Sequence, residues 1–191
     1  LSQANFVISM LPAGPHVRAL YEDIILGHVS AEAVLIDCST IDVESARAVA
    51  YMAQQKGLDV LDAPVSGGTV GAENGTLTFM VGGAEKAFIR AREVLEAMGK
   101  NIIHAGGAGN GQAAKICNNM MLGIQMISVA EAFNLAEALG LDAENLFNIS
   151  STSSGQCWSL TNYCPVPGLV PTAPSNRDYQ PGFSANMMRK D

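Results

Sequence analysis

Short apolar runs alternate with helix-like patterns over the first half of this chain. Runs of this length, almost wholly apolar, are typical of strands that are buried on both faces of a mainly parallel sheet. Pro12 follows the first run and Pro64 the third, so we expect both strands to end there. The predicted strands are residues 6–10, 33–37, 58–62, 76–81 and 101–104.

Two of the intervening segments have the marks of helices. Asp42 can cap a helix over residues 43–56, which Gly57 then ends. A second helix is predicted over residues 85–98, ended by Gly99. Strands that alternate with helices predict an α/β domain with right-handed crossover connections.

The pattern changes after a cluster of glycines between Gly106 and Gly111. From Gln112 to Leu139 the sequence predicts one long helix, and Asp142 can cap the next. Nothing typical of a strand follows, and five of the eight prolines lie between Pro165 and Pro181. We therefore place a boundary near residue 109, with an α/β domain over residues 1–109 and an α-helical domain over residues 110–191. We expect both to be incomplete, because the sequence begins with Leu1 rather than Met, runs at once into a strand-like segment and stops without an ending signal.

Composition narrows the classes of function. Hydrophobic residues make up 48% of the chain and charged residues 15%, against roughly 25% charged in an average soluble protein. So few charges predict much buried surface, including an interface between subunits or domains, and we expect a homo-oligomer. The net charge of −7 disfavours nucleic acid as a partner. No apolar run is long enough to predict a membrane span, and the cysteines and histidines have no spacing that predicts a metal site.

Lys115 is the only charged residue between Gln112 and Ala130. A helix that is apolar on every side is expected to be buried, and lysine is seldom buried without a reason because burial disfavours its charged form. Asn119 follows four residues later, on the same side of the helix. Lysine beside an amide is a candidate proton donor or acceptor. The alternative is a lysine of the first helical turn whose ammonium reaches water past the helix end.

A second candidate site follows the third predicted strand, in the segment 62–68 with the sequence Asp-Ala-Pro-Val-Ser-Gly-Gly. Glycines let backbone N–H groups approach a ligand, and together with the Ser66 hydroxyl they could hold a carboxylate. The alternative is a crossover loop that needs glycine for its own geometry. The later glycines at 106–111 lack the G-x-G-x-x-G spacing of a dinucleotide loop, which occurs nowhere in the chain, so we interpret them as a hinge into the long helix.

These motifs resemble the 3-hydroxyacid dehydrogenase family over essentially the whole chain. Residues 62–83 resemble its substrate-binding signature, and residues 109–119 resemble its catalytic helix. Residues 154–158 and 165–168 resemble the branch that acts on 3-hydroxyisobutyrate. The resemblance implies a Rossmann-like mainly parallel sheet domain that binds NAD, followed by a long helix and an all-α domain.

The resemblance also implies roles for residues of both candidate sites. Lys115 would be the general acid/base, and Asn119 would orient it and the substrate oxygen. Ser66, Gly67 and Gly68 would hold the carboxylate of a small 3-hydroxy acid.

Further residues would contact the cofactor by the same resemblance. Leu11 and Pro12 match a cofactor-contacting turn, Thr40 a second contact, and Lys190 a lysine near the nicotinamide. Each has a plainer alternative, because Ser39 and Thr40 could cap a helix and Lys190 could be a solvated lysine near a chain end.

The implied reaction is the NAD-dependent oxidation of 3-hydroxyisobutyrate to methylmalonate semialdehyde in valine catabolism. The implied location is the cytoplasm in a bacterium or the mitochondrial matrix in a eukaryote. One alternative is a reductase of tartronate or succinate semialdehyde with the same site. Another is a non-catalytic member that serves in oligomerisation or binding, although such a protein has no use for a charge at Lys115.

Overall fold

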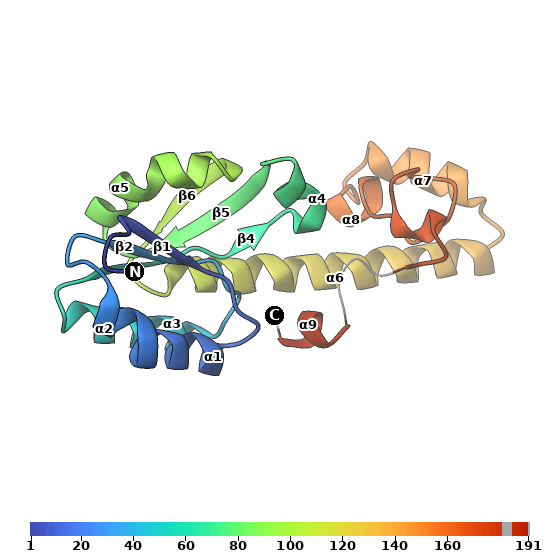
Figure 1. The fold of residues 1–191 in the computed structure, drawn as a ribbon. Coiled ribbons are helices and arrows are strands. Elements are labelled where there is room, and N and C mark those ends of the chain that lie inside the picture. Colours follow the sequence, from blue (N-terminus) through green and yellow to red (C-terminus); the bar gives the residue numbers. More distant parts are fainter. Residues whose placement is uncertain (181–184, 191) are drawn as a thin grey trace. The chain divides into compact units, whose positions relative to one another are not determined.

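A computed structural model describes residues 1–180 and 185–190 of the chain (Figure 1). They form two compact units, Leu1–Cys117 and Asn118–Lys190. No helix in these described ranges is long and apolar enough to cross a membrane.

The first unit is built on one mixed sheet in which most pairs are parallel. Its hydrogen-bonded strands follow the order β1-β2-β3-β5-β4, and β6 also pairs with β5. β1, β2 and β3 are parallel to one another, and β5 is parallel to β6. The predicted α/β class with a mainly parallel sheet is therefore confirmed. The strands are β1 (Phe6–Ser9), β2 (Val34–Asp37), β3 (Asp59–Asp62), β4 (Val65–Ser66), β5 (Leu77–Gly82) and β6 (Gly99–Gly106).

The sheet changes direction at Pro64, where the sequence predicted a strand end. β3 pairs with β5 only through Asp62 and Gly82, and β4 then continues that antiparallel pairing. Proline cannot donate to a sheet, but the Pro64 carbonyl accepts a 3.0 Å hydrogen bond from the N–H of Met80. β3 itself ends at Asp62, so the predicted strand end is confirmed. The antiparallel pairing then brings the carboxyl ends of β3 and β5 side by side.

Helices cover both faces of this sheet (Figure 1). On one face Val34 and Ile36 pack against Phe88 and Leu95 of α5. On the other face Leu35 packs in a cluster with residues of α1 and α3. The sheet is therefore the middle of three layers. Among the helical segments of the first unit, the sequence predicted α3 and α5 but not α1, η1, α2 or α4. These segments are α1 (Gly14–Leu20), the π-helical η1 (Tyr21–Ile25), α2 (Leu26–His28), α3 (Val43–Gln54), α4 (Gly68–Glu73) and α5 (Glu85–Glu96).

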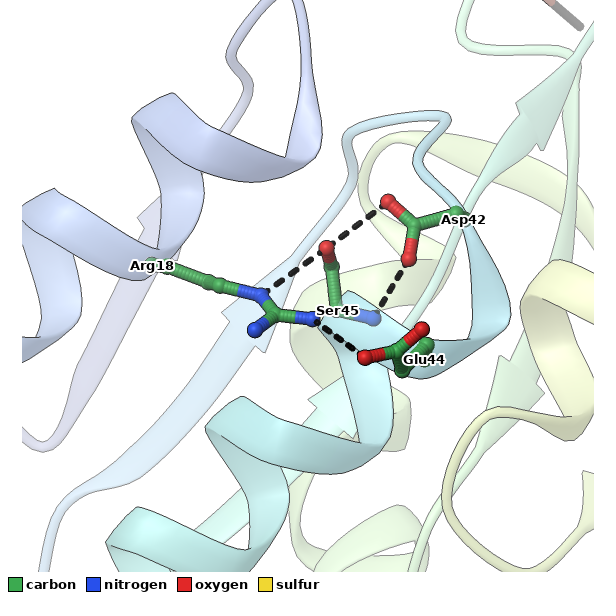
Figure 2. A network of polar contacts seen from close by, with 4 residues as sticks. All are labelled: Arg18, Asp42, Glu44 and Ser45. Carbon is green, nitrogen blue, oxygen red and sulfur yellow. Dashed lines mark hydrogen bonds and ion pairs between the residues drawn. The ribbon is translucent and has the colours of Figure 1, made fainter.

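Asp42 caps α3, as the sequence predicts. Its Oδ1 accepts from the Ser45 N–H and its Oδ2 from the Ser45 hydroxyl, both at 2.7 Å. The Arg18 Nε donates to the same hydroxyl at 3.0 Å, and the Arg18 guanidinium pairs with Glu44 at 3.6 Å (Figure 2). This network joins the cap of α3 to α1.

The second unit is helical in its described residues. Its core contains Val129, Phe133, Leu160 and Val170. Asp142 caps α7, as predicted, by accepting from the Asn145 N–H at 3.1 Å. The helices from the unit boundary onward are α6 (Asn110–Ala138), α7 (Ala143–Ser151), α8 (Trp158–Thr161), the 3-10 turn η2 (Pro174–Asn176) and α9 (Ala185–Lys190).

α6 forms as the predicted long helix, but it is not buried on every side. Met120, Ile124 and Ile127, spaced at helical intervals, are 60–66% exposed. The expectation of all-round burial is wrong for this stripe. An apolar helix sequence predicts that the helix surface will be covered, but it does not show that residues of the same chain cover it.

Candidate active site

Three neighbouring strands end in buried polar residues. Ser9, Asp37 and Asp62 are the last residues of β1, β2 and β3, and each is at most 7% exposed. Because these strands are parallel, the three residues lie along one edge of the sheet. Ligands of open α/β sheets bind outside the carboxyl ends of the strands, so these three residues mark the candidate site.

Asp37 is the centre of a buried hydrogen-bonded group. Its Oδ1 accepts from the hydroxyls of Ser9 and Ser39, each at 2.7 Å, and the Tyr21 hydroxyl lies 3.2 Å from Ser9 Oγ. Burial raises the pKa of Asp37, and the hydrogen bonds from Ser39 and Ser9 oppose the shift. Burial likewise raises the pKa of Tyr21, and it raises that of the neighbouring Cys38 thiol to about 12. The Tyr21 hydroxyl and the Cys38 thiol therefore stay protonated and neutral beside the buried carboxyl of Asp37.

The same group joins two of the predicted cofactor-contacting turns. The Ser39 hydroxyl donates to Asp37 and accepts a 2.7 Å hydrogen bond from the Leu11 N–H. This ties the turn that contains Leu11 and Pro12 to the turn that contains Thr40. Since Asp42 caps α3, Ser39 has a different role from the capping alternative. Leu11 and Thr40 are half-buried and Pro12 is exposed.

Gln112 connects the second of these turns to α6. Its side chain is fully buried. Its Nε2 donates to the Ser39 carbonyl at 2.7 Å, and its Oε1 accepts from the Ile41 N–H at 3.1 Å. The two peptide groups that flank Thr40 are thus both held by one amide from the first turn of α6.

Asp62 anchors the start of α6 itself. Its Oδ1 accepts from the Gly109 N–H at 2.8 Å and its Oδ2 from the Gln112 N–H at 3.0 Å. These are N–H groups at a helix start, which have no partner within the helix. Burial raises the pKa of Asp62, against the opposing hydrogen bonds from Gly109 and Gln112. The predicted hinge at the glycines is therefore pinned to the end of β3.

Lys115 and Asn119 lie one turn apart on α6, and each is 8% exposed. The burial that the sequence predicts for Lys115 is confirmed, whereas the alternative required an ammonium in water. Asn119 Oδ1 also lies 3.4 Å from the Nδ2 of Asn118, which donates to it. A buried lysine next to an amide can exchange a proton with a bound hydroxyl, provided that a substrate reaches it.

The predicted carboxylate-binding residues lie at the far end of the β4–β5 hairpin from Asp62. Ser66 ends β4 and is half-buried, whereas Gly67 and Gly68 are exposed. Their φ angles of +135° and +63° require glycine. This backbone leads directly into α4, so the glycines serve the turn whether or not they also bind a ligand.

Lys190, the last predicted cofactor contact, is exposed at the end of α9 in the second unit. Sequence reasoning gave no role to Asp37 or Gln112. A signal for Asp37 was available, because a carboxylate that ends a wholly apolar strand must find partners.

Comparison with known families identifies the fold. The family described as the NAD binding domain of 6-phosphogluconate dehydrogenase matches residues 1–107. The family described as "NAD-binding of NADP-dependent 3-hydroxyisobutyrate dehydrogenase" matches residues 109–191. The chain belongs to the first of these families, whose model covers more than half of it. Together the two matches bear out the resemblance to hydroxyacid dehydrogenases. The Rossmann-like character expected of the first unit is established.

Individual relatives agree with this assignment. A probable 3-hydroxyisobutyrate dehydrogenase of Mycobacterium tuberculosis is 52% identical over 100% of this chain and 65% of its own length. An NAD-dependent L-serine dehydrogenase of Pseudomonas aeruginosa is also 52% identical, over 98% of this chain and 64% of its own. The solved structure of Mycobacterium tuberculosis 3-hydroxyisobutyrate dehydrogenase with L-serine superposes with a TM-score of 0.95, over 99% of this chain and 65% of that one. The chain therefore spans about 65% of the length of these relatives.

The structure fits part of an NAD site. Two turns outside the strand ends are held rigidly by Ser39 and Gln112, and they present the half-buried Thr40. The chain contains no G-x-G-x-x-G sequence, which is the usual cradle for the pyrophosphate. The described residues therefore supply turns at the strand ends of such a site but not the usual phosphate cradle.

Proposed function

We propose that the protein oxidises 3-hydroxyisobutyrate to methylmalonate semialdehyde, a step of valine catabolism, with Lys115 as the general acid/base. The observation that carries this proposal is the burial of Lys115 and Asn119 on one turn of the helix that Asp62 and Gln112 anchor at the strand ends. We also propose that the two domains divide near residue 109, as the change of pattern indicates.

When bound, NAD⁺ accepts a hydride from the carbon that carries the substrate hydroxyl. The residues of this chain manage the proton and the charge. The neutral amine of Lys115 takes the hydroxyl proton, and the resulting ammonium stabilises the negative charge that develops on the oxygen. Asn119 hydrogen-bonds the lysine and the same oxygen, which keeps the two in line.

Ser66 and the N–H groups after it hold the substrate carboxylate in this proposal. Support comes from the positive φ of Gly67 and Gly68, since successive N–H groups in such a backbone form an anion-binding concavity. Leu11, Pro12, Thr40 and Lys190 contact the cofactor.

L-Serine is the second candidate substrate. One 52% identical relative is named an L-serine dehydrogenase, and the structural relative with a TM-score of 0.95 is described with L-serine. Serine and 3-hydroxyisobutyrate share the CH₂OH group and the carboxylate, and they differ by an ammonium in place of a methyl group. Comparison of kcat/KM for the two separates them, because a pocket that bonds an ammonium rejects a methyl group strongly.

The test of the mechanism is Lys115→Ala and Lys115→Met in the full-length protein. Both should lower kcat by about 10²–10⁴-fold with little change in NAD affinity, and methionine preserves most of the side-chain volume. Lys100→Ala, at an exposed lysine of β6, is the matched control and should keep normal activity. If the Lys115 variants fold and retain most of their activity, the lysine mechanism is wrong.

A further inference from the structure

Gln112 makes contacts that the catalytic mechanism above does not use. Its amide orientation is unambiguous, because one end faces a carbonyl, that of Ser39, and the other faces an N–H, that of Ile41. The bonds reach 73 and 71 residues along the chain. They leave Thr40 between two fixed peptide groups.

The backbone of Gln112 is fixed as well. Its N–H donates to Asp62 Oδ2 at 3.0 Å, and it belongs to the first turn of α6. Lys115 follows three residues later in the same helix, so its backbone moves rigidly with that of Gln112. One residue is thus bonded to the Thr40 turn and built into the Lys115 helix.

We propose that Gln112 is a positioning residue that sets the Thr40 turn against the start of the Lys115 helix, and so sets the cofactor against the acid/base group. This inference rests on the proposed function. The physical need is plain: hydride and proton leave the same substrate group, so the cofactor and the lysine must keep a fixed separation. A displacement of about 1 Å between reacting groups costs on the order of 10²-fold in rate.

A purely structural role predicts a different outcome. A buried amide is costly unless its hydrogen bonds are satisfied, so its loss would destabilise the fold in either case. Stability alone therefore cannot separate the two roles. The KM for NAD and the pH profile can, because a residue that only fills space changes neither.

The first test is Gln112→Met in the full-length protein, which keeps the volume and loses both side-chain bonds. At temperatures below the melting temperature of the variant, we expect kcat/KM for NAD to fall about 10- to 100-fold and the KM for NAD to rise. Leu95→Ala is the matched control. It opens a cavity in the α5 core and should lower the melting temperature without changing the KM for NAD.

The second test is Gln112→Glu, because a protonated glutamic acid reproduces the amide. Its OH donates to the Ser39 carbonyl and its carbonyl oxygen accepts from the Ile41 N–H. The ionised form turns an acceptor toward the Ser39 carbonyl. Among the titratable groups near it in the chain or by hydrogen bond, Asp62 on β3 accepts from the Gln112 N–H, Asp37 accepts from the Ser39 hydroxyl, and Lys115 follows three residues later on α6. We expect the activity of this variant, divided by that of the wild type, to be highest at low pH and to fall as the new carboxyl ionises.

The outcomes are distinct. Normal kinetics for NAD in Gln112→Met, or a flat activity ratio across pH in Gln112→Glu, would overturn the positioning role. If Gln112→Met does not fold, the pH profile of Gln112→Glu decides alone. Failure of the proposed function shows separately, as full activity in Lys115→Ala.

Discussion

The carboxylate of Asp62, at the end of β3, accepts a 3.0 Å hydrogen bond from the backbone N–H of Gln112 in the first turn of α6. A second N–H, that of Gly109, donates to its other oxygen at 2.8 Å. A side chain of the sheet therefore caps the helix that carries Lys115.

Asp62→Ala should lower the free energy of unfolding of the first unit by about 2–4 kcal/mol, because two buried N–H groups lose their acceptor. Asp62→Asn should cost less, since one oxygen remains. The matched control is Asp59→Asn at the other end of the same strand, where a surface ion pair with Lys86 at 3.3 Å is worth at most about 1 kcal/mol. Urea unfolding measures all three, and equal losses at the two positions would contradict the capping role.

The space around Gly111 gives a second prediction. A Cβ there would lie closer than 3.0 Å to the carbonyl oxygens of Met80 and Asp62, whereas a Cβ at Gly123 of the same helix meets nothing within 4 Å. Gly111→Ala should therefore destabilise the protein by about 2–3 kcal/mol, and Gly123→Ala should stabilise it by about 0.5–1 kcal/mol. Thermal melts of both variants provide the check. A neutral Gly111→Ala would mean that α6 does not pack this tightly onto the strand ends.

The two capping aspartates offer a matched pair. Asp42 accepts two hydrogen bonds from Ser45, whereas Asp142 accepts one from Asn145 in an exposed cap. Asp42→Ala should cost about 1–2 kcal/mol and Asp142→Ala about 0.5–1 kcal/mol. Chemical denaturation near neutral pH measures the difference.

The cost of Asp42→Ala should also depend on pH. Burial acts to raise the pKa of Asp42, but hydrogen bonds from the Ser45 side chain and backbone, with the charge of Arg18, outweigh it and leave the pKa lowered. A lowered pKa in the folded state means stability that is present above the ordinary pKa and lost as the pH falls through the lowered one. The difference in free energy of unfolding between wild type and Asp42→Ala should therefore become smaller in acid. A difference that does not change with pH would rule out a charged Asp42 as the cap.

Asp37 should show the opposite sign. Burial raises its pKa, and its Oδ2 has no hydrogen-bond partner among the described residues. Stability from a raised pKa is present below the ordinary value, about 3.9, and is lost as the pH rises through the raised value. The free energy of unfolding of the wild type, relative to that of Asp37→Asn, should thus fall as the pH rises between these two pKa values. Above the raised value, the difference between the two proteins should no longer change with pH. Urea titrations of both proteins at a series of pH values test this, because the contribution of Asp62 cancels in the difference.

The elements that the sequence predicted are those whose signals are local. The apolar run of β2 is buried on both faces, and Asp42 and Asp142 cap the helices that they precede. The short α1 lacks an extended apolar period, although Pro15 at its start was an available signal. The reversal at Pro64 depends on pairing with β5, which no local pattern encodes.

The candidate site divides in the same way. Lys115 could be found because a single charge interrupts an apolar helix, and the glycines at 67 and 68 because their backbone requires that residue type. The partners of Gln112 lie more than seventy residues away along the chain. An amide in an apolar stretch therefore indicated burial but not what it would hold.

The boundary between the compact units falls inside α6, after Cys117. A protease or a cloning cut placed there would sever a continuous run of i to i+4 hydrogen bonds. Each product would then carry a partial helix whose last backbone N–H or C=O groups have lost their helical partners and face solvent. Attempts to study the two units separately should accordingly keep all of α6 with one of the units. The boundary between the units lies within this helix and not in a loop.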